Sequence, residues 1–236
     1  MLIYWMLFSL PVFFLFFFPF QHDKNIKKIA WICLGVIFIL FIGLRHETAA
    51  DWGSYLSKYN LIVDQSLSLI ESMAISEPGY AVINWISAQI NGGIYLVNVI
   101  CATLVLIGTI TFCQRQPIPL LAFIIAVPYF LIVLAMGSPR QSVALALVMI
   151  AFIQLIESRF FYALLLVFFG SLFHSSVLIL LPLLILGYPQ TIKPKWILLF
   201  FSILAVSFFL YYSEFLSLFS QYIMDSMKSE GAIYRI

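Results

Sequence analysis

The stretch Gly43-Leu44-Arg45-His46-Glu47-Thr48-Ala49-Ala50-Asp51-Trp52-Gly53-Ser54-Tyr55 follows directly on an apolar run over residues 29–44. It gathers a cation, two acids, a histidine and two aromatic residues, in a chain of which only 9% is charged. A charge that enters or borders lipid is costly unless it faces water, a partner or a substrate. We therefore predict that this stretch forms one wall of a polar site, which fragments around Glu77, Arg140 and His174 complete.

The composition excludes a soluble domain. Of the 236 residues, 64% are hydrophobic, and the mean hydropathy is +1.08. Soluble domains average about 45–50% apolar residues. Alternating segments of about ten residues, which are typical of membrane β-barrels, are absent. We predict an all-α polytopic membrane protein. The net charge is only +2, with the charges between apolar runs, so no nucleic-acid partner is expected.

The apolar runs predict the spans, because a membrane helix needs about 20 such residues. We expect about eight transmembrane helices in one transmembrane domain over residues 1–236. They cover residues 2–20, 29–44, 94–113, 118–136, 140–156 and 196–212, with two short helices within 160–188 that meet at His174. The first run has no basic residues before it, so we expect a retained helix and not a cleaved signal.

The long loop over residues 45–93 is predicted to be helical. Apolar residues recur at helical spacing within 55–63, 67–73 and 77–90. Pro78 suits the first turn of the third helix, and Asn91-Gly92-Gly93 ends it. Such amphipathic helices are expected to cap one end of the bundle at the membrane surface.

Basic residues in alternate loops predict the orientation. Seven of the twelve lie on one side: Lys24, Lys27, Lys28, Arg115, Arg159, Lys193 and Lys195. We therefore place this side in the cytoplasm and both termini outside. As a consequence, the outer face receives Arg45, Asp51, Glu77, Arg140 and His174. The agreement of these separate polar residues on one side favours a single extracytoplasmic site.

Two arginines are candidates for binding an anion. Pro139-Arg140-Gln141 begins a helix, so unpaired backbone N–H groups lie beside a guanidinium, and this combination suits phosphate. The alternative is that Arg140 pairs with a nearby acid and holds the bundle together. Arg45 ends the second span, where a cation also stabilises a helix C-terminus or anchors the helix at the interface.

Three residues are candidates for a general base. The carboxylates of Asp51 and Glu77 could accept the proton of a hydroxyl group, and ion pairs or helix caps are the alternative roles. His174 stands between two apolar helices, and its alternative is a hydrogen-bonded structural role. A serine–histidine–acid triad is weakly supported because no nucleophile-elbow pattern is present.

Aromatic residues near these groups are candidates for stacking on sugars. They are Trp52, Tyr55 and Tyr80, and the alternative is an interfacial aromatic belt. No metal is predicted, because neither His22, His46 and His174 nor Cys33, Cys101 and Cys113 have the spacing of a zinc site. No cofactor is expected either.

Several fragments together resemble a known family. Gly43-Leu44-Arg45, Asp51-Trp52-x-x-Tyr55, Glu77-Pro78-Gly79-Tyr80, Arg140-Gln141 and Leu172-Phe173-His174-x-Ser176 are similar, in this order, to motifs of the EpsG-like group of Wzy-type polysaccharide polymerases. The resemblance implies a glycosyltransferase that polymerises oligosaccharide repeat units carried on polyprenyl pyrophosphate, at the outer face of the bacterial cell (inner) membrane. It also implies a flippase and a chain-length regulator as partners.

The resemblance assigns roles to the residues already singled out. Pyrophosphate would contact Arg45, Arg140 and Gln141, one of Asp51, Glu77 and His174 would act as base, and the sugars would contact Trp52, Tyr55 and Tyr80. Two other functions are less favoured. A flippase or transporter of lipid-linked glycan would need polar residues deep in the spans, and few are present. A membrane acyltransferase using His174 would need a second cluster on the cytoplasmic side, where the loops are short.

Overall fold

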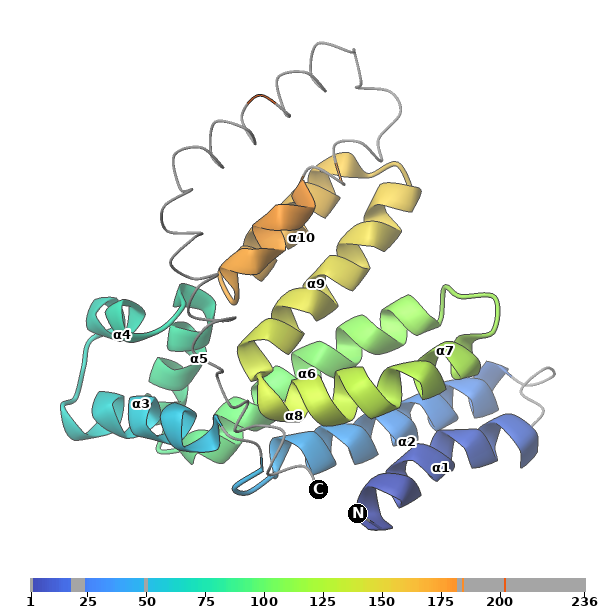
Figure 1. The fold of residues 1–236 in the computed structure, drawn as a ribbon, viewed down its shortest axis with the longest axis horizontal. Helices are drawn as coiled ribbons and strands as arrows, with labels where there is room; N and C mark the ends of the chain where they lie inside the picture. The colour runs from blue at the N-terminus through green and yellow to red at the C-terminus, as the bar shows by residue number, and fades with distance from the viewer. Residues whose placement is uncertain (1, 18–23, 49–50, 182–183, 185–201, 203–236) are drawn as a thin grey trace, which may run out of the picture.

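A computed structural model describes residues 2–17, 24–48, 51–181, 184 and 202. In this part of the chain all regular structure is helical, with no β-strand (Figure 1). Four segments are long and apolar enough to cross a membrane: Asn25–Gly43, Gly93–Cys113, Pro119–Gly137 and Pro139–Ile156. The predicted all-α polytopic fold is thus confirmed. The expected span over residues 196–212 lies outside the described residues, apart from residue 202.

Four helices form the larger part of the bundle. α1 (Leu2–Phe17) and α2 (Lys24–Gly43) come first, and α6 (Gly93–Cys113) lies between α2 and α9 (Pro139–Ile156). α6 approaches α9 closely at one glycine. A Cβ atom on Gly108 would lie 2.7 Å from the carbonyl oxygen of Ala146, so only glycine allows the two backbones to pack at this distance.

The third long span changes helix type along its length. α7 (Pro119–Ala126) passes into a π-helix over Val127–Leu134, and α8 (Ala135–Gly137) follows. Pro128 has no N–H and cannot bond to the carbonyl of Ile124, so the regular α-helical ladder breaks where the π-helix begins. This span then turns directly into α9 at Ser138.

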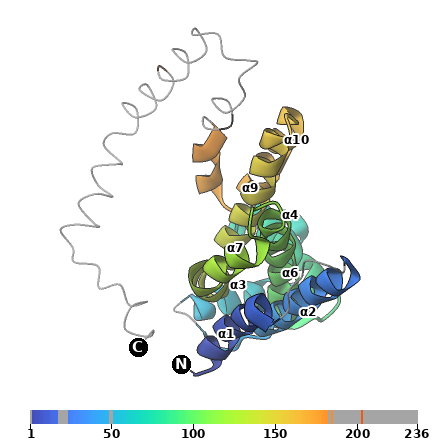
Figure 2. The ribbon, with the colours of Figure 1, turned by 90° about the vertical axis from the view of Figure 1, so that its right-hand side faces the viewer.

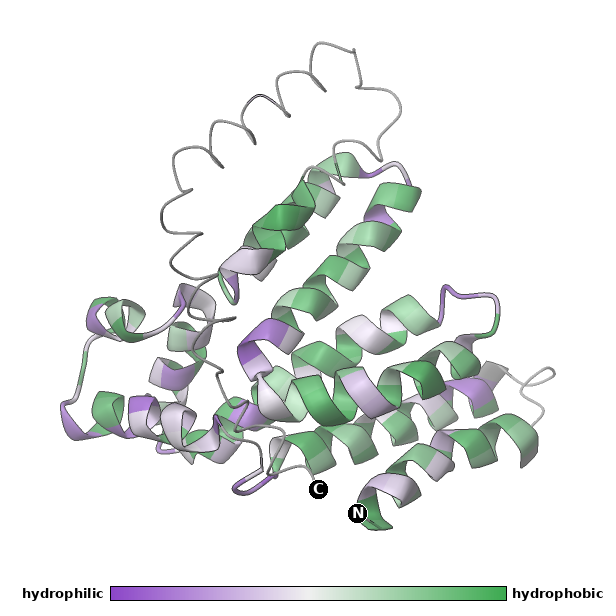
Figure 3. Cartoon of the chain, viewed as in Figure 1, coloured by the Kyte–Doolittle hydropathy of each residue, from purple (hydrophilic) through white to green (hydrophobic). Residues whose placement is uncertain are grey.

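Aromatic packing joins this span to α2. The ring of Phe123 meets Trp31 edge to face at 5.6 Å and Phe38 at 5.4 Å between centroids. Each such pair contributes about 0.5–1.5 kcal/mol beyond the burial of its area. Away from this core, large apolar side chains such as Ile125, Ile156 and Phe161 are exposed, and the helices are largely hydrophobic along their length (Figure 3). An apolar exterior of this kind suits contact with lipid.

The long loop folds into three helices, as predicted. They are α3 (Trp52–Asp64), α4 (Leu69–Ile75) and α5 (Pro78–Gln89), and they lie together at one end of the bundle (Figure 1). The Tyr59 hydroxyl accepts a hydrogen bond from the Gly93 N–H at 3.1 Å, and the Ser87 hydroxyl donates to the Gly93 carbonyl at 2.7 Å. These bonds attach the loop to the first residue of α6.

Polar residues mark the opposite end of the bundle. There, Glu157 pairs with Arg115 at 2.7 Å and with Arg159 at 3.3 Å. Arg115 follows α6, Glu157 follows α9, and Arg159 precedes α10 (Phe160–Ser171). The bundle therefore has two polar ends. Which end faces the cytoplasm stays a prediction from the loop charges.

The predicted break at His174 is present. α10 runs beside α9 and ends at Ser171, His174 is extended, with φ −158° and ψ 118°, and a 3₁₀-helix over Ser175–Leu180 follows. Both views show α9 and α10 side by side, projecting away from α1 and α2 (Figure 2). Apart from residue 184, the rest of the predicted seventh span lies outside the described residues, as does the mixed tail from residue 213.

Candidate functional site

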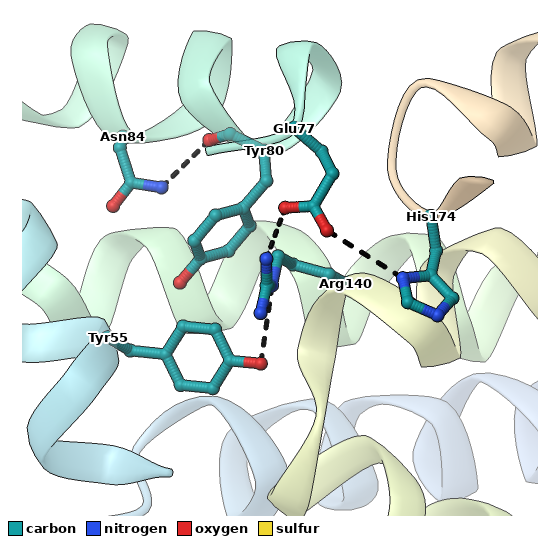
Figure 4. Close-up of polar contacts among 6 residues, drawn as sticks. All are labelled: Tyr55, Glu77, Tyr80, Asn84, Arg140 and His174. Carbon is teal, nitrogen blue, oxygen red and sulfur yellow. Dashed lines mark hydrogen bonds and ion pairs between the residues drawn. The ribbon is translucent and has the colours of Figure 1, made fainter. Parts of the chain in front are cut away.

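An ion pair lies between the first turns of α5 and α9. Arg140 Nη1 donates to Glu77 Oε2, although 63 residues separate the two in sequence (Figure 4). Both side chains are about one quarter exposed, at 24% and 26%. Each stands at the start of a helix because Pro78 and Pro139 occupy the first helical positions. The pair is therefore partly shielded but open to a solute.

His174 lies on the other side of the same carboxylate. Its Nδ1 is 3.7 Å from Glu77 Oε1, while Glu77 Oε2 faces the guanidinium (Figure 4). This separation is too long for a hydrogen bond but close enough for an ion pair when the imidazole is protonated. The Glu77 carboxylate thus lies between Arg140 and His174.

Two buried tyrosines support the guanidinium. Arg140 Nε donates to the Tyr55 hydroxyl at 3.4 Å, and the guanidinium carbon lies 5.2 Å from the centre of the Tyr55 ring. The Tyr55 ring meets the Tyr80 ring edge to face at 5.6 Å. Both tyrosines are almost fully buried. Arg140 is therefore held by a carboxylate, a hydroxyl group and an aromatic face.

A backbone contact brings Glu77 and His174 together. The Gly79 N–H donates to the Leu172 carbonyl at 2.8 Å, which joins the first turn of α5 to the end of α10. Gly79 belonged to a recognised fragment, but the sequence assigned it no role. The available signal was a glycine in the first turn of a helix, where it costs stability relative to alanine.

The pKa of Glu77 is lowered on balance. Partial burial raises the pKa, but the backbone N–H of Glu77 and the hydrogen bond and charge of Arg140 outweigh burial, and His174 adds to the lowering. Burial raises the pKa of the Tyr55 hydroxyl despite the nearby Arg140. At neutral pH the site therefore holds an ionised carboxylate, a guanidinium and a neutral phenol.

Arg45 lies buried beside this site and not on its surface. Its Nη1 donates to the Ala135 carbonyl at 2.6 Å, and its Nη2 donates to Asn98 Oδ1 at 3.3 Å. Only 5% of the residue is exposed, and its charge acts on both Tyr55 and Tyr80. Burial lowers the pKa of Arg45. Its expected contact with pyrophosphate stays a prediction.

The other predicted residues lie outside the Glu77–Arg140–His174 cluster. Asp51 is exposed just before α3, and its side chain makes no hydrogen bond or ion pair with the described residues. Trp52 packs instead against the rings of His46, at 5.7 Å, and Tyr95, at 6.1 Å. Gln141 is half-buried. The predicted roles of these residues and of the two tyrosines stay predictions.

Among the described residues, no group of three or more His, Cys, Asp or Glu side chains could hold a metal.

Fold and site together define a polytopic helical membrane protein with a charged site at one end of its bundle. Residues 28–236 match the EpsG family, so the chain belongs to that family. Membership indicates a membrane protein of the polysaccharide-polymerase type. No curated protein and no solved structure matches the chain. The resemblance inferred from the short motifs is confirmed.

Proposed function

We propose that this chain is a glycosyltransferase that polymerises oligosaccharide repeat units carried on polyprenyl pyrophosphate, at the extracytoplasmic face of a bacterial cell membrane. The observation that carries the proposal is the Glu77 carboxylate between Arg140 and His174, at one end of an apolar bundle. This arrangement offers a cation for a departing diphosphate and a base for an incoming hydroxyl group. Family membership supports the same substrate class.

The bonds in the proposed reaction balance without a cofactor. The acceptor sugar hydroxyl attacks the anomeric carbon of the donor glycan, and the bond from that carbon to the pyrophosphate oxygen breaks. The hydroxyl proton passes to a base on the protein. The polyprenyl pyrophosphate leaves with the bonding electron pair and gains negative charge, and stabilising this charge is the largest demand on the site.

Arg140 meets that demand. It stands in the first turn of α9, where the helix N-terminus also favours an anion. Its Nη1 and Nε groups are used by Glu77 and Tyr55, while Nη2 has no hydrogen bond to a described residue. Two of the three guanidinium nitrogens are thus bonded to the protein, and the remaining N–H groups can donate to phosphate oxygens.

His174 is the base that we propose among the three candidates. Glu77 is a poor base because, despite partial burial, its pKa is lowered by its own backbone N–H and by Arg140, and a general base works best when its pKa is near the operating pH. The Glu77 carboxylate, 3.7 Å from His174 Nδ1, instead stabilises the cation formed when His174 takes a proton. The Asp51 side chain makes no hydrogen bond or ion pair with Glu77 or His174.

The decisive experiment incubates the purified full chain, in lipid nanodiscs, with a polyprenyl-pyrophosphate-linked repeat unit from the host bacterium. We expect a ladder of longer lipid-linked glycans. His174→Ala should slow the reaction about 100- to 10,000-fold, the usual contribution of a general base. The matched control is His46→Ala, since His46 is exposed and bonds to Tyr95, away from Arg140. Equal rates for the two variants, or no ladder from the wild-type chain, would contradict the proposal.

A further inference from the structure

The turn between the third long span and α9 contains an acceptor that its own helix cannot satisfy. The Ala135 carbonyl would normally bond to the N–H four residues later, but that residue is Pro139, which has no N–H. Ala135 is only 2% exposed, so water does not readily serve as the donor. A buried carbonyl without a partner costs about 1–3 kcal/mol.

Arg45 supplies the missing donor. Its Nη1 donates to the Ala135 carbonyl at 2.6 Å, across 90 residues of sequence, while its Nη2 reaches Asn98 Oδ1 on α6. A single side chain at the end of α2 thereby joins three spans. Hydrogen bonds from a charged donor are about twice as strong as neutral ones.

The cation is buried without an acid in contact among the described residues. Burial lowers the pKa of Arg45, and the neighbouring Tyr80 and Tyr55 offset this only in part. Such a charge is a costly way to stabilise a bundle, since an apolar side chain of similar volume is often as good. The benefit of an arginine here is instead directional, because its two amino groups fix the positions of the Ala135 carbonyl and the Asn98 amide.

The Ala135 carbonyl, which Arg45 holds in place, is close in sequence to Arg140 of the site. Ala135 precedes Arg140 by five residues, and the intervening turn is tightly bonded. The Ser138 N–H donates to the Leu134 carbonyl at 2.7 Å, and the Ser142 N–H donates to the Ser138 carbonyl at 3.0 Å. Movement of the Ala135 carbonyl would therefore shift the first turn of α9.

We propose that Arg45 is a positioning residue that acts on the reaction through Arg140, and that it does not itself contact the pyrophosphate. Its role in the reaction rests on the proposed function, whereas its role in ordering the turn does not. The competing role is direct contact with the anion through Arg45 Nε, which is buried and has no partner among the described residues.

The first test needs no activity. Hydrogen–deuterium exchange of the substrate-free full chain in nanodiscs is compared for the wild type and Arg45→Met, which has no donor. We expect the Ser142 amide to exchange about tenfold faster or more in the variant, since a charged hydrogen bond is lost near it. Asn98→Ala, which removes one of the two acceptors, should give a smaller rise and serves if Arg45→Met does not accumulate. The control is Arg115→Met, which lies at the opposite polar end. Unchanged exchange in both site variants overturns the proposal.

The second test separates positioning from direct contact. In the polymerisation assay, Arg45→Met should lower kcat about 100-fold, the effect of a misplaced catalytic group. In a chain that already carries Arg140→Lys, adding Arg45→Met should lower kcat by a further factor of less than about three, because the two residues act as one unit. Losses that multiply independently would show a separate contact with substrate and overturn the proposal. A wild-type chain without activity would contradict the proposed function and would leave the conclusion from hydrogen–deuterium exchange unaffected.

Discussion

The ring of Phe173 occupies the space into which any side chain on Gly79 would point. A Cβ atom at Gly79 would lie 2.9 Å from two carbons of that ring and 3.1 Å from the Leu172 carbonyl oxygen. The absence of a side chain at this position therefore lets α5 reach the end of α10. Because Glu77 begins α5 and His174 follows α10, this contact sets the distance between the carboxylate and the imidazole.

Gly79→Ala should damage the site without altering any charged group. The added methyl must push Phe173 or α5 aside, which typically costs about 1–3 kcal/mol of stability. Polymerisation activity should fall by more than the loss of folded protein accounts for, because Glu77 and His174 move apart. The matched control is Gly53→Ala, at an exposed position of α3 where nothing lies within 4 Å of the new Cβ. That change should stabilise the chain by about 0.5–1 kcal/mol. Thermal unfolding in detergent measures the stability change of both variants. A Gly79→Ala variant as stable as the wild type would disprove the tight fit.

Glu77→Gln should lower the polymerisation rate strongly while keeping the shape of the side chain. The neutral amide leaves Arg140 without its counter-ion and His174 without a carboxylate to stabilise its protonated form. We expect kcat to fall about 100-fold or more, the lower range for loss of acid–base assistance. Glu71→Gln provides the comparison, since Glu71 is exposed and belongs to the capping box of α4, a role that glutamine also fills. Similar rates for the two variants would remove Glu77 from the site.

Stability should fall in acid through the same carboxylate. The pKa of Glu77 is lowered in the folded chain relative to its ordinary value of 4.5. The stabilisation is therefore fully present above pH 4.5 and is lost as the pH falls through the lower, folded-state value. Melting temperatures of the wild type and Glu77→Gln, measured from neutral pH downward, should differ most above pH 4.5 and converge below it. A difference that does not change with pH would show that the charge of Glu77 contributes nothing.

Tyr55 should act mainly through its ring. Tyr55→Phe removes only a long hydrogen bond of 3.4 Å to Arg140 and should cost less than about 1 kcal/mol. Tyr55→Ala also removes the aromatic face beneath the guanidinium and leaves a cavity, at a cost of about 3–5 kcal/mol. Unfolding midpoints order the two variants, and the KM for the lipid-linked donor should rise more in Tyr55→Ala. A larger effect of Tyr55→Phe would instead make the hydroxyl the important group.

The local features of this chain could be read from the sequence. Apolar runs and helical spacing predicted the described spans, the three helices of the loop over residues 45–93 and the break at His174. These features depend on neighbours within one or two turns, so a linear pattern contains them. The alternation of loops likewise predicted that Arg45, Asp51, Glu77, Arg140 and His174 would lie at one end of the bundle.

Only the tertiary structure decided which of these residues meet. It joined Arg140 to Glu77 across 63 residues, left Asp51 in solvent, and buried Arg45 against a carbonyl 90 residues away. It also showed that Gly79 is needed at a point of close approach. Contacts of this kind depend on how helices cross and on which small residues allow two backbones to touch. Neither periodicity nor composition contains that information, because the partners are set by packing between elements and not within them.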